Sequence, residues 1–316
     1  TTWISGFVLL IIVYYLNAET LMIDKSINDI SSLTAIVISV LFLLGSWLLY
    51  DFLCKSPLKE HTEIFTIVGF SIAIIICFFL TKIYGSRAAY IHAGACLGTI
   101  MAANVFRVII PSQKDMVNAA LSGKAPDVNK SISAKTRSLH NNYITLPVLF
   151  IMISSHYPFT YGHKYNWIIL ALLSLIGATA RHYFNLRNKK QNKVWVLPLA
   201  AIGMVLLMLY TSVPKIISDK RVSIASSTAV SFVEINHIVQ TRCVGCHASN
   251  PSFAGITEPP LGVIYDTPQD IVKNLNKIKA QVVDSNIMPP GNVTGITQEE
   301  REKISLWIQQ GANINN

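Results

Sequence analysis

The sequence predicts an all-α protein in two parts, a polytopic helical membrane domain and a small helical domain that follows it. Of its 316 residues, 51% are hydrophobic and only 14% are charged, which is too apolar for an ordinary soluble protein. Long apolar runs succeed one another as far as residue 213, whereas residues 229–316 are polar and carry a Cys-x-x-Cys-His motif. These observations place a membrane domain before a compact domain with its own chemistry.

The apolar runs are long enough to be helices that cross a membrane. Pro147 interrupts the fifth run and Pro158 closes it. We expect about seven spans in a membrane domain of residues 1–213, then a linker at 214–228 and a second domain at 229–316. Because the chain opens at Thr1, almost inside an apolar run, we also expect its N-terminal part to be missing. The runs lie at 3–16, 31–53, 62–80, 88–110, 143–158, 166–184 and 194–213.

The stretch Cys243-Val244-Gly245-Cys246-His247 has the spacing of a c-type haem attachment site. Its two thiols add across the vinyl groups of the haem, and the histidine becomes the proximal ligand of the iron. A zinc site would need a second pair of Cys or His ligands, and none follows His247. A thioredoxin-like site would need a βαβ setting, which the surrounding sequence does not offer. The motif therefore predicts one covalent haem c.

Met288 is the expected sixth ligand of that iron. It is the only methionine after residue 208, and no histidine follows His247. His/Met ligation raises the reduction potential into the range used for electron transfer. The alternative is that Met288 is a methionine of the hydrophobic core.

Helix signals surround these ligands. A helix is expected over 229–240, a second begins at Thr267, and a capping box opens a third at Thr297. One face of the third helix is apolar and is expected to pack on the first helix; it carries Ile304, Trp307 and Ile308. Residues 229–316 thus resemble a small class I cytochrome c domain. That resemblance implies that a backbone carbonyl within 259–262 orients the proximal imidazole.

The direction of the chain across the membrane can be predicted from charge. The loops at 54–61, 111–142 and 185–193 hold 11 Lys and Arg, and the loops on the opposite side hold 4. Basic loops stay in the cytoplasm, so the domain after the seventh span lies outside it. Haem attachment to this motif also takes place outside the bacterial inner membrane. We therefore expect a periplasmic cytochrome domain. The net charge of +9 is spread over these short loops, so no nucleic-acid partner is expected.

Polar side chains inside the spans are candidate functional residues, because burying them in lipid is costly. Near the inner ends the cations and hydrogen-bonding groups suit a planar anion, although an arginine at a span end can also snorkel to the interface. Near the outer ends His92 and His156 suit redox or proton traffic. The inner candidates are Arg107, His140, Asn141 and Arg181, with Asn104, Asn142 and His182 close by.

Several short strings carry a more specific resemblance. Together with the haem motif, they are similar to the membrane-bound, cytochrome-c-linked urate hydroxylases of the urate oxidase N-terminal domain family, over essentially the whole chain. The strings are Trp3–Gly6, Tyr14–Thr20, Ile91–Gly94, Asn104–Phe106, Arg137–Tyr143 and Ser155–Pro158.

The resemblance implies an oxidoreductase that converts urate to 5-hydroxyisourate in purine catabolism. Electrons would pass through the fused haem to a diffusible cytochrome c or a terminal oxidase. The resemblance assigns no catalytic role to individual residues of the membrane domain. It also implies a further N-terminal span that this chain lacks.

Two alternatives remain at this point. The chain can be a membrane-anchored cytochrome c subunit that transfers electrons within a respiratory complex, although an anchor needs only one span. The membrane domain can also hold a second haem between histidine pairs, His92 with His156 outside and His140 with His182 inside. We expect one haem only, with His92 and His156 on the outer redox path.

Overall fold

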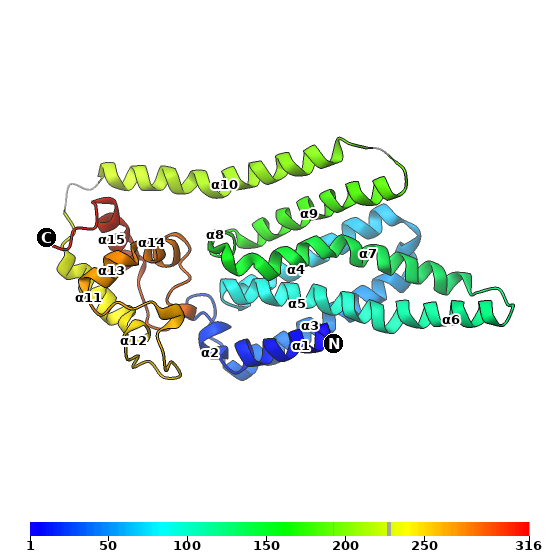
Figure 1. Cartoon of the computed structure of the whole chain (residues 1–316), viewed down its shortest axis with the longest axis horizontal. Helices are drawn as coiled ribbons and strands as arrows, with labels where there is room; N and C mark the ends of the chain where they lie inside the picture. The colour runs from blue at the N-terminus through cyan, green and yellow to red at the C-terminus, as the bar shows by residue number, and fades with distance from the viewer. Residues whose placement is uncertain (192, 226–228, 316) are drawn as a thin grey trace.

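The computed structural model describes residues 1–191, 193–225 and 229–315, and these form helices without any strand. A bundle of long helices makes up most of the molecule, and a domain of short helices lies at one end of it (Figure 1). The helices of the bundle are α1 (Thr2–Leu10), α2 (Ala18–Leu21), α3 (Ser32–Lys55), α4 (Thr62–Ile83), α5 (Ser86–Asn104), α6 (Ile110–Leu121), α7 (Val128–Ile153), α8 (Pro158–Tyr161), α9 (Asn166–Asn188) and α10 (Val196–Ala225).

Within the described residues, four helices are long and apolar enough to cross a membrane, as in a multi-pass membrane protein. Two shorter apolar helices, Thr2–Tyr15 and Val196–Ser212, lie beside them. Each of the predicted apolar runs coincides with a helix of the bundle, and the count of seven spans stays a prediction. The four long helices are Ser32–Lys55, Thr62–Ile83, Ser86–Leu121 and Asn166–Asn188.

The expected loop at 111–142 is wrong, because most of it is helical. α5 continues through a π-helical turn (Val105–Ile109) into α6, and α7 begins at Val128, so the connection is only 122–127. Asp127 caps the start of α7 by accepting hydrogen bonds from the amides of Asn129 and Lys130. A helix can continue into water without apolar residues. The helices are therefore longer than the apolar runs from which they were predicted.

The sequence had led us to expect that Pro147 interrupts its helix, but it does not. It lies inside α7, which runs unbroken to Ile153. A Cβ placed on Gly177 of α9 would lie 3.2 Å from Leu146 Cβ and 3.5 Å from the Pro147 ring. The missing side chain of Gly177 thus lets α9 pack closely over the proline, and neighbouring helices are what tolerate proline in such segments.

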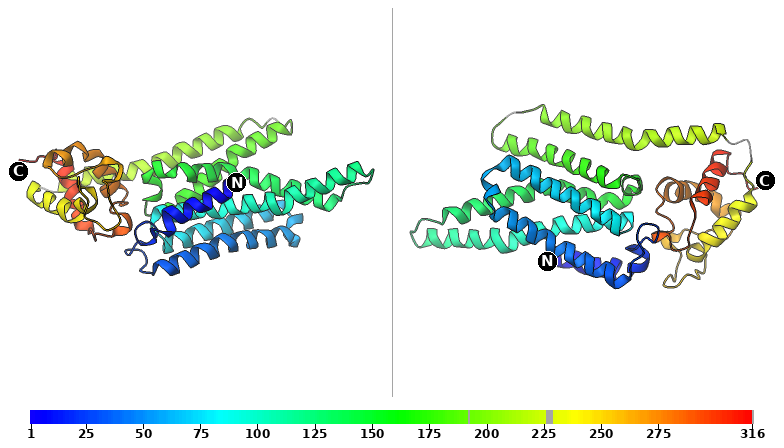
Figure 2. Two further views of the ribbon diagram at one scale, coloured as in Figure 1. Left: turned by 60° about the horizontal axis from the view of Figure 1, so that its bottom comes forward. Right: turned by 180° about the vertical axis from the view of Figure 1, so that it is seen from behind.

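α5 is the central helix of the bundle and packs against α3, α4 and α7, as the views in Figure 2 show. Small residues let helices approach closely in membrane proteins, and α5 is rich in them. Its buried face includes Ala88, Ala89, Ala93 and Cys96. This face also buries one of the candidate residues, His92, deep in the bundle.

The C-terminal domain is built from α11 (Phe232–Arg242), α12 (Val244–His247), α13 (Pro268–Lys273), α14 (Leu275–Ile278) and α15 (Gln298–Gln309). The helix starts predicted at Thr267 and Thr297 are confirmed, each with both hydrogen bonds of a capping box. The predicted packing of α15 on α11 is also confirmed, since the rings of Trp307 and Phe232 lie 5.7 Å apart. Within the predicted linker, residues 226–228 and the side chains of 214–225 lie outside the described residues.

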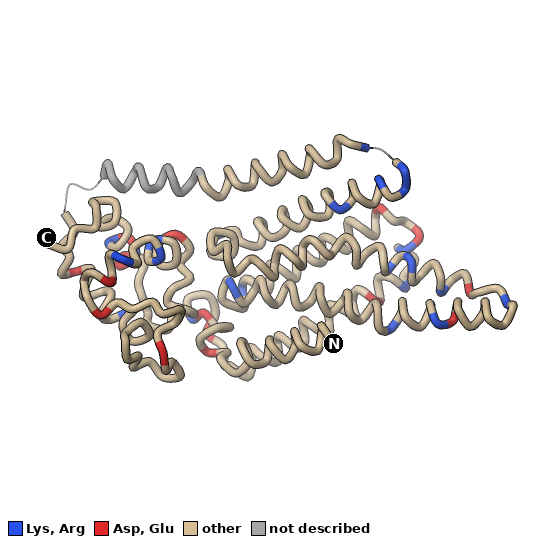
Figure 3. Tube along the Cα trace, in the orientation of Figure 1, with Lys and Arg blue, Asp and Glu red and all other residues tan. Residues whose placement is uncertain are grey.

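The charges of the bundle are unevenly distributed along its length. Most of its Lys and Arg lie toward the end opposite the C-terminal domain, as Figure 3 shows. Basic residues favour the cytoplasmic side of a membrane. The arrangement therefore agrees with the charge argument made from the sequence, because the loops richest in Lys and Arg share one end of the bundle.

Candidate functional site

The Cys-x-x-Cys-His motif forms a single turn of helix after α11. The amides of Cys246 and His247 donate to the Cys243 carbonyl at 3.2 and 3.0 Å. This turn holds both thiols and the imidazole on one short piece of backbone. Cys243 and Cys246 are free and half-buried.

The imidazole of His247 is held by a backbone carbonyl. Its Nδ1 lies 2.9 Å from the Val263 carbonyl oxygen, and an oxygen of this kind can only accept, so Nδ1 carries the proton. The ring also lies 5.2 Å from the ring of Tyr265, whose amide donates to the His247 carbonyl. Because Nδ1 carries the proton and donates to the Val263 carbonyl, the lone pair of Nε2 is left for a metal. The orienting carbonyl belongs to Val263, one residue beyond the stretch expected from the sequence, because Leu261 and Gly262 turn the chain with positive φ.

Met288 lies against the same hydrophobic core as Cys243. Its amide donates to the Gln281 carbonyl at 3.0 Å, and its carbonyl accepts from Nη1 of Arg301 at 2.9 Å. Arg301 is itself buried and bonds the Val282 carbonyl as well. The backbone on either side of the sulfur is therefore fixed, although Met288 is not part of a regular helix.

These residues fit a covalently attached haem. The Cys243 thiol and the Met288 thioether pack against one apolar core, whose members include Val239, Val263 and Ile278, and Cys246 and His247 follow Cys243 on the same turn of helix. Burial, with a smaller effect of the neighbouring thiol, raises the pKa of Cys243 to about 12, so without a bound group Cys243 is a neutral thiol. Among the described residues, no three His, Cys, Asp or Glu side chains gather as a metal-ion site.

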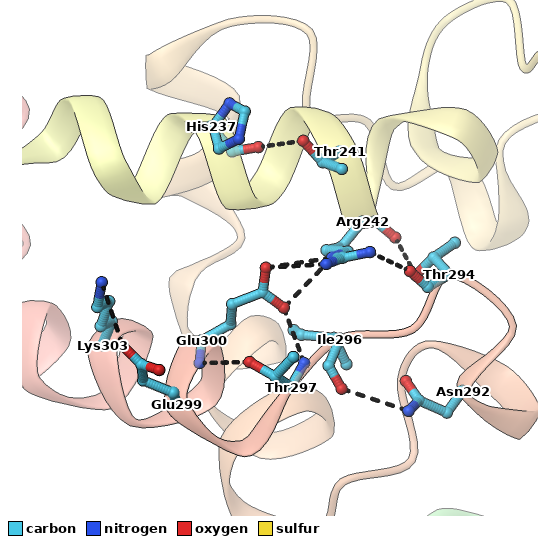
Figure 4. Close-up of polar contacts among 10 residues, drawn as sticks. All are labelled: His237, Thr241, Arg242, Asn292, Thr294, Ile296, Thr297, Glu299, Glu300 and Lys303. Carbon is cyan, nitrogen blue, oxygen red and sulfur yellow. Dashed lines mark hydrogen bonds and ion pairs between the residues drawn. The ribbon is translucent and has the colours of Figure 1, made fainter. Parts of the chain in front are cut away.

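An ion pair ties the end of α11 to the start of α15, as Figure 4 shows. Arg242 Nη2 lies 3.1 Å from Glu300 Oε1, and Arg242 Nη1 donates to the Thr294 carbonyl at 2.6 Å. Burial opposes ionisation of Glu300, but the Thr297 amide and the Arg242 guanidinium outweigh it and hold the pKa of this carboxyl below its ordinary value. These contacts of Arg242, which we call the bracket of Arg242 and Glu300, fix the position of α15, the helix that carries Arg301.

The helical domain contains a buried polar network in which the predicted residues Asn104 and Asn141 meet Arg137 and Asp51, which were not singled out from the sequence. Arg137 on α7, with 3% of its side chain exposed, pairs with Asp51 on α3 at 2.6 Å. Its Nη1 donates to Asn104 Oδ1 at 2.9 Å, and Asn104 in turn donates to Asn141 Oδ1 at 3.0 Å. Asn141 also donates to the Met101 carbonyl. Three helices are thus joined by polar contacts inside the bundle.

His140 lies one turn along α7 from this network. Its Nδ1 is 2.8 Å from the Tyr50 hydroxyl, and its ring stacks on Phe65 at 4.9 Å. The Arg137 guanidinium lies over the Tyr50 ring at 5.6 Å. The structure therefore brings the predicted residues His140 and Asn141 together around Arg137.

The two predicted arginines lie outside this network, Arg107 on the π-helical turn that follows α5 and Arg181 on α9. Arg107 is exposed, with its guanidinium 5.7 Å from the Trp47 ring. Arg181 on α9 is half-buried and donates through Nε to Asn142 Oδ1. Beside it, the exposed His182 bonds the Tyr143 hydroxyl at 2.6 Å. Asn142 directly follows Asn141, so α7 connects Arg181 to the buried network.

The two outer histidines have different surroundings. His156 lies exposed on a short 3-10 turn (Ser154–His156). His92 is fully buried and donates through Nδ1 to the Ala88 carbonyl at 2.7 Å. Its Nε2 has no hydrogen-bond partner in the described part of the chain. Three aromatic rings surround it, those of Tyr84 at 4.7 Å, Tyr14 at 6.0 Å and Tyr15 at 6.4 Å.

A family model described as "Urate oxidase N-terminal" matches residues 1–212. The chain belongs to this family. Neither the curated proteins nor the solved structures that were compared include a match to the chain. Membership in the urate oxidase N-terminal family indicates a urate-related function and an oxidoreductase.

The match covers the whole helical domain as far as residue 212 and excludes the haem motif. All the membrane candidates, His92, Arg107, His140, Asn141, His156 and Arg181, therefore lie within the urate oxidase N-terminal domain. Asp51, Tyr50 and Arg137 were missed. Asp51 is the only carboxylate within the apolar run at 31–53, and an acid inside a span is itself a signal. Arg137 fell in a stretch that was taken for a loop.

Proposed function

We propose that this protein is a membrane urate hydroxylase of purine catabolism, which oxidises urate to 5-hydroxyisourate and passes the electrons through a c-type haem in its C-terminal domain. In the overall reaction, urate and water yield 5-hydroxyisourate, two protons and two electrons. A diffusible cytochrome c or a terminal oxidase of the respiratory chain is the acceptor. The single observation that carries this proposal is a urate oxidase N-terminal domain followed by a Cys-x-x-Cys-His turn.

The haem supplies one-electron redox chemistry when it is bound. Cys243 and Cys246 would hold it through thioethers, and His247 Nε2 and the Met288 sulfur would be the two protein ligands of its iron. The Val263 carbonyl fixes the imidazole, and Arg301 fixes the backbone at Met288. These second contacts support the ligand assignment, because metal ligands are oriented by such partners. They support the proposal that residues 229–316 are a class I cytochrome c domain, which we place in the periplasm of a bacterial inner membrane.

The substrate side is proposed around Arg107, Arg181, His140 and Asn141. Urate is a planar anion at neutral pH, and a guanidinium offers paired donors to such a group. Arg137 is already neutralised by Asp51, so it supports the site rather than binding an anion. Neither Arg107 nor Arg181 has a carboxylate partner among the salt bridges of the described residues.

Urate-dependent reduction of the haem in purified membranes tests the function. The expected result is a reduced c-type spectrum on adding urate under anaerobic conditions, with 5-hydroxyisourate as product. Xanthine, which lacks the C8 oxygen, is the control ligand. A haem that is reduced by a quinol and not by urate would contradict the proposal and favour the anchored electron-transfer subunit.

Met288→Ala tests the distal ligand, with Val283→Ala as the control because Val283 packs on the same core without a sulfur. We expect the weak sulfur-to-iron absorption band to disappear and the reduction potential to fall in the first variant only. Retention of both the band and the potential in Met288→Ala would exclude Met288 as a ligand.

Pyridine haemochrome analysis tests the number of haems. We expect one haem c for each chain and nothing that extracts into acidic acetone. A stoichiometric extractable haem would show a second haem, and the histidine pairs His92 with His156 and His140 with His182 would then be its candidate ligands.

A further inference from the structure

The segment that carries Met288 is also one of the parts of the C-terminal domain that contact the helical domain, together with α15, which lies against α10. A Cβ placed on Gly291 would lie 2.3 Å from the Ile23 carbonyl oxygen and 3.2 Å from that of Thr20. A Cβ on Gly162 would lie 2.3 Å from the Ser285 carbonyl oxygen. Residues 285–291 therefore sit against α2 and α8, at the end of the bundle where Figure 1 shows the C-terminal domain.

The contact is close because two glycines lack side chains. Gly291 has φ +57, a conformation that glycine adopts without strain, and it faces backbone rather than flexible side chains. Within the segment 285–291, Ile287 packs on the hydrophobic core of the helical domain. Surfaces that fit this closely are typical of fixed interfaces.

Aromatic residues lie directly beneath this contact. Met22 and Ile23 are buried, and the Met22 carbonyl accepts from the amide of Gly85 at 2.8 Å. The neighbouring residue is Tyr84, which is fully buried and stacks on His92. His92 is seven residues beyond Gly85 on α5, which corresponds to about 10 Å along a helix. The unpartnered Nε2 of His92 thus lies about two turns below the docked segment.

We infer that residues 285–291 dock the C-terminal domain on α2 and α8, and that electrons enter its haem on the Met288 side, from the cluster of Tyr84 and His92. This inference rests on the proposed function. Urate would give up two electrons as it is oxidised, the aromatic cluster would lie on their path to the haem that the C-terminal domain would hold, and the respiratory acceptor would take up both electrons. The domain works in the docked position and does not swing on its linker.

Glycine-to-alanine variants test the docking from both sides of the contact. Gly291→Ala and Gly162→Ala each place a methyl group within 2.3 Å of a backbone oxygen of the other domain. Gly295→Ala is the control for the first, because Gly295 also has a positive φ (+66) but its nearest neighbour is a side-chain atom 3.7 Å away. Gly98→Ala is the control for the second, because nothing lies within 4 Å of its Cβ position.

Hydrogen exchange of the full-length protein reads out docking without any urate chemistry. We expect faster exchange in residues 18–24 and 285–291 in both test variants and in neither control. The double variant should exchange no faster than the single ones, since both substitutions break one interface. Unchanged exchange in both test variants would overturn the docking inference.

The rate of haem reduction reads out the electron route. We expect Gly291→Ala and Gly162→Ala to slow reduction by urate about tenfold or more, because small displacements of reacting groups have effects of this size. Reduction by ascorbate should stay as in the wild type. Undocking that leaves the urate-driven rate at the level of Gly295→Ala would overturn the electron route while the proposed function stands. A wild-type protein that urate does not reduce would instead refute the proposed function, and the exchange data would still decide the docking.

Tyr84→Leu and Tyr84→Phe test the aromatic cluster. The first removes the ring and the second keeps it, while both lose the hydrogen bond from the hydroxyl to the Ala35 carbonyl. We expect only Tyr84→Leu to slow urate-driven reduction, with exchange at 285–291 unchanged. Equal rates in the two variants would exclude Tyr84 from the route.

Discussion

The two domains hold their chemistry in different ways. In the C-terminal domain, Cys243, Cys246 and His247 come from one turn of helix, so their spacing in the sequence is also their spacing in space. In the helical domain, Asp51, Asn104 and Arg137 come from three helices and meet only in the folded bundle. A local motif can therefore be read from the sequence, whereas a network that bridges helices needs the structure.

The domains also differ in what fixes their functional groups. In the Cys-x-x-Cys-His motif, His247 is held by backbone, through the Val263 carbonyl. The groups of the helical domain are held by other side chains, which must satisfy one another because lipid offers no hydrogen bonds. Losing one member should therefore affect only the haem in the first case and the whole bundle in the second.

The largest expected effect is the loss of covalent haem when the cysteines of the Cys-x-x-Cys-His motif are replaced. Cys243→Ala with Cys246→Ala should abolish covalent haem completely, because no thioether can form, while the helical domain still inserts in the membrane. Haem staining after denaturing electrophoresis and detergent extraction of the membranes measure the two results. Cys96→Ala, which removes a buried thiol of α5, is the control and should keep its haem. Covalent haem in the double variant would show that the motif is not the attachment site.

The buried ion pair should have the next largest effect. Arg137→Leu leaves Asp51 with Lys55, at 2.6 Å, as its remaining ion-pair partner, so the loss in the free energy of unfolding should lie at the lower end of the about 3–5 kcal/mol expected for breaking a buried pair. Asp51→Leu should have a similar effect, and the double variant should lose much less than the sum. Unfolding of the purified protein in detergent measures these differences.

Arg187→Leu on the exposed face of α9 is the control for the ion pair, with an expected change within about 0.5 kcal/mol. If the double variant lost as much free energy of unfolding as the two single variants together, Arg137 and Asp51 would not be coupled. The bundle would then depend on single residues independently, as the C-terminal domain is expected to do.

How much could be predicted follows the same division. The helices of the C-terminal domain begin where the capping boxes at Thr267 and Thr297 predict, because a cap acts within four residues. The apolar runs locate the helices of the bundle, but not their polar ends, so α7 begins at Val128 rather than at 143. The pairing of Arg137 with Asp51 spans 86 residues, and no local pattern encodes it. The pairing depends on how α3 and α7 pack in the folded bundle.

A smaller effect is expected on the substrate side. Arg181→Gln and Arg107→Gln should each raise the KM for urate about tenfold, since a hydrogen bond to a charged group contributes about 1.5–3 kcal/mol. Haem content should be unchanged, because neither residue belongs to the C-terminal domain. Steady-state kinetics with urate and a soluble cytochrome acceptor measure the change, and Arg187→Gln is the matched control. Wild-type KM values in both variants would exclude these arginines from urate binding.

The smallest effect concerns the pH dependence of the C-terminal domain. The pKa of Glu300 is lowered in the folded domain, because the Thr297 amide and Arg242 outweigh the effect of burial. The folded state thus binds this proton less tightly than the unfolded state, so stability rises with pH. The contribution, about 1 kcal/mol, is complete above the ordinary carboxyl pKa of about 4.3 and disappears as the pH falls through the lowered value.

Glu300→Gln tests this contribution, with Glu299→Gln on the exposed side of the same first turn as the control. Unfolding measured at several pH values should show a deficit for Glu300→Gln at pH 7 that closes below about pH 4. Glu299→Gln should follow the wild type throughout, since no bracket to α11 involves Glu299. A deficit that stayed constant down to low pH would mean that the bracket of Arg242 and Glu300 acts through packing rather than charge. Packing would then fix the contact between α11 and α15, whereas an ion pair and hydrogen bonds fix the network of Asp51, Asn104 and Arg137 in the bundle.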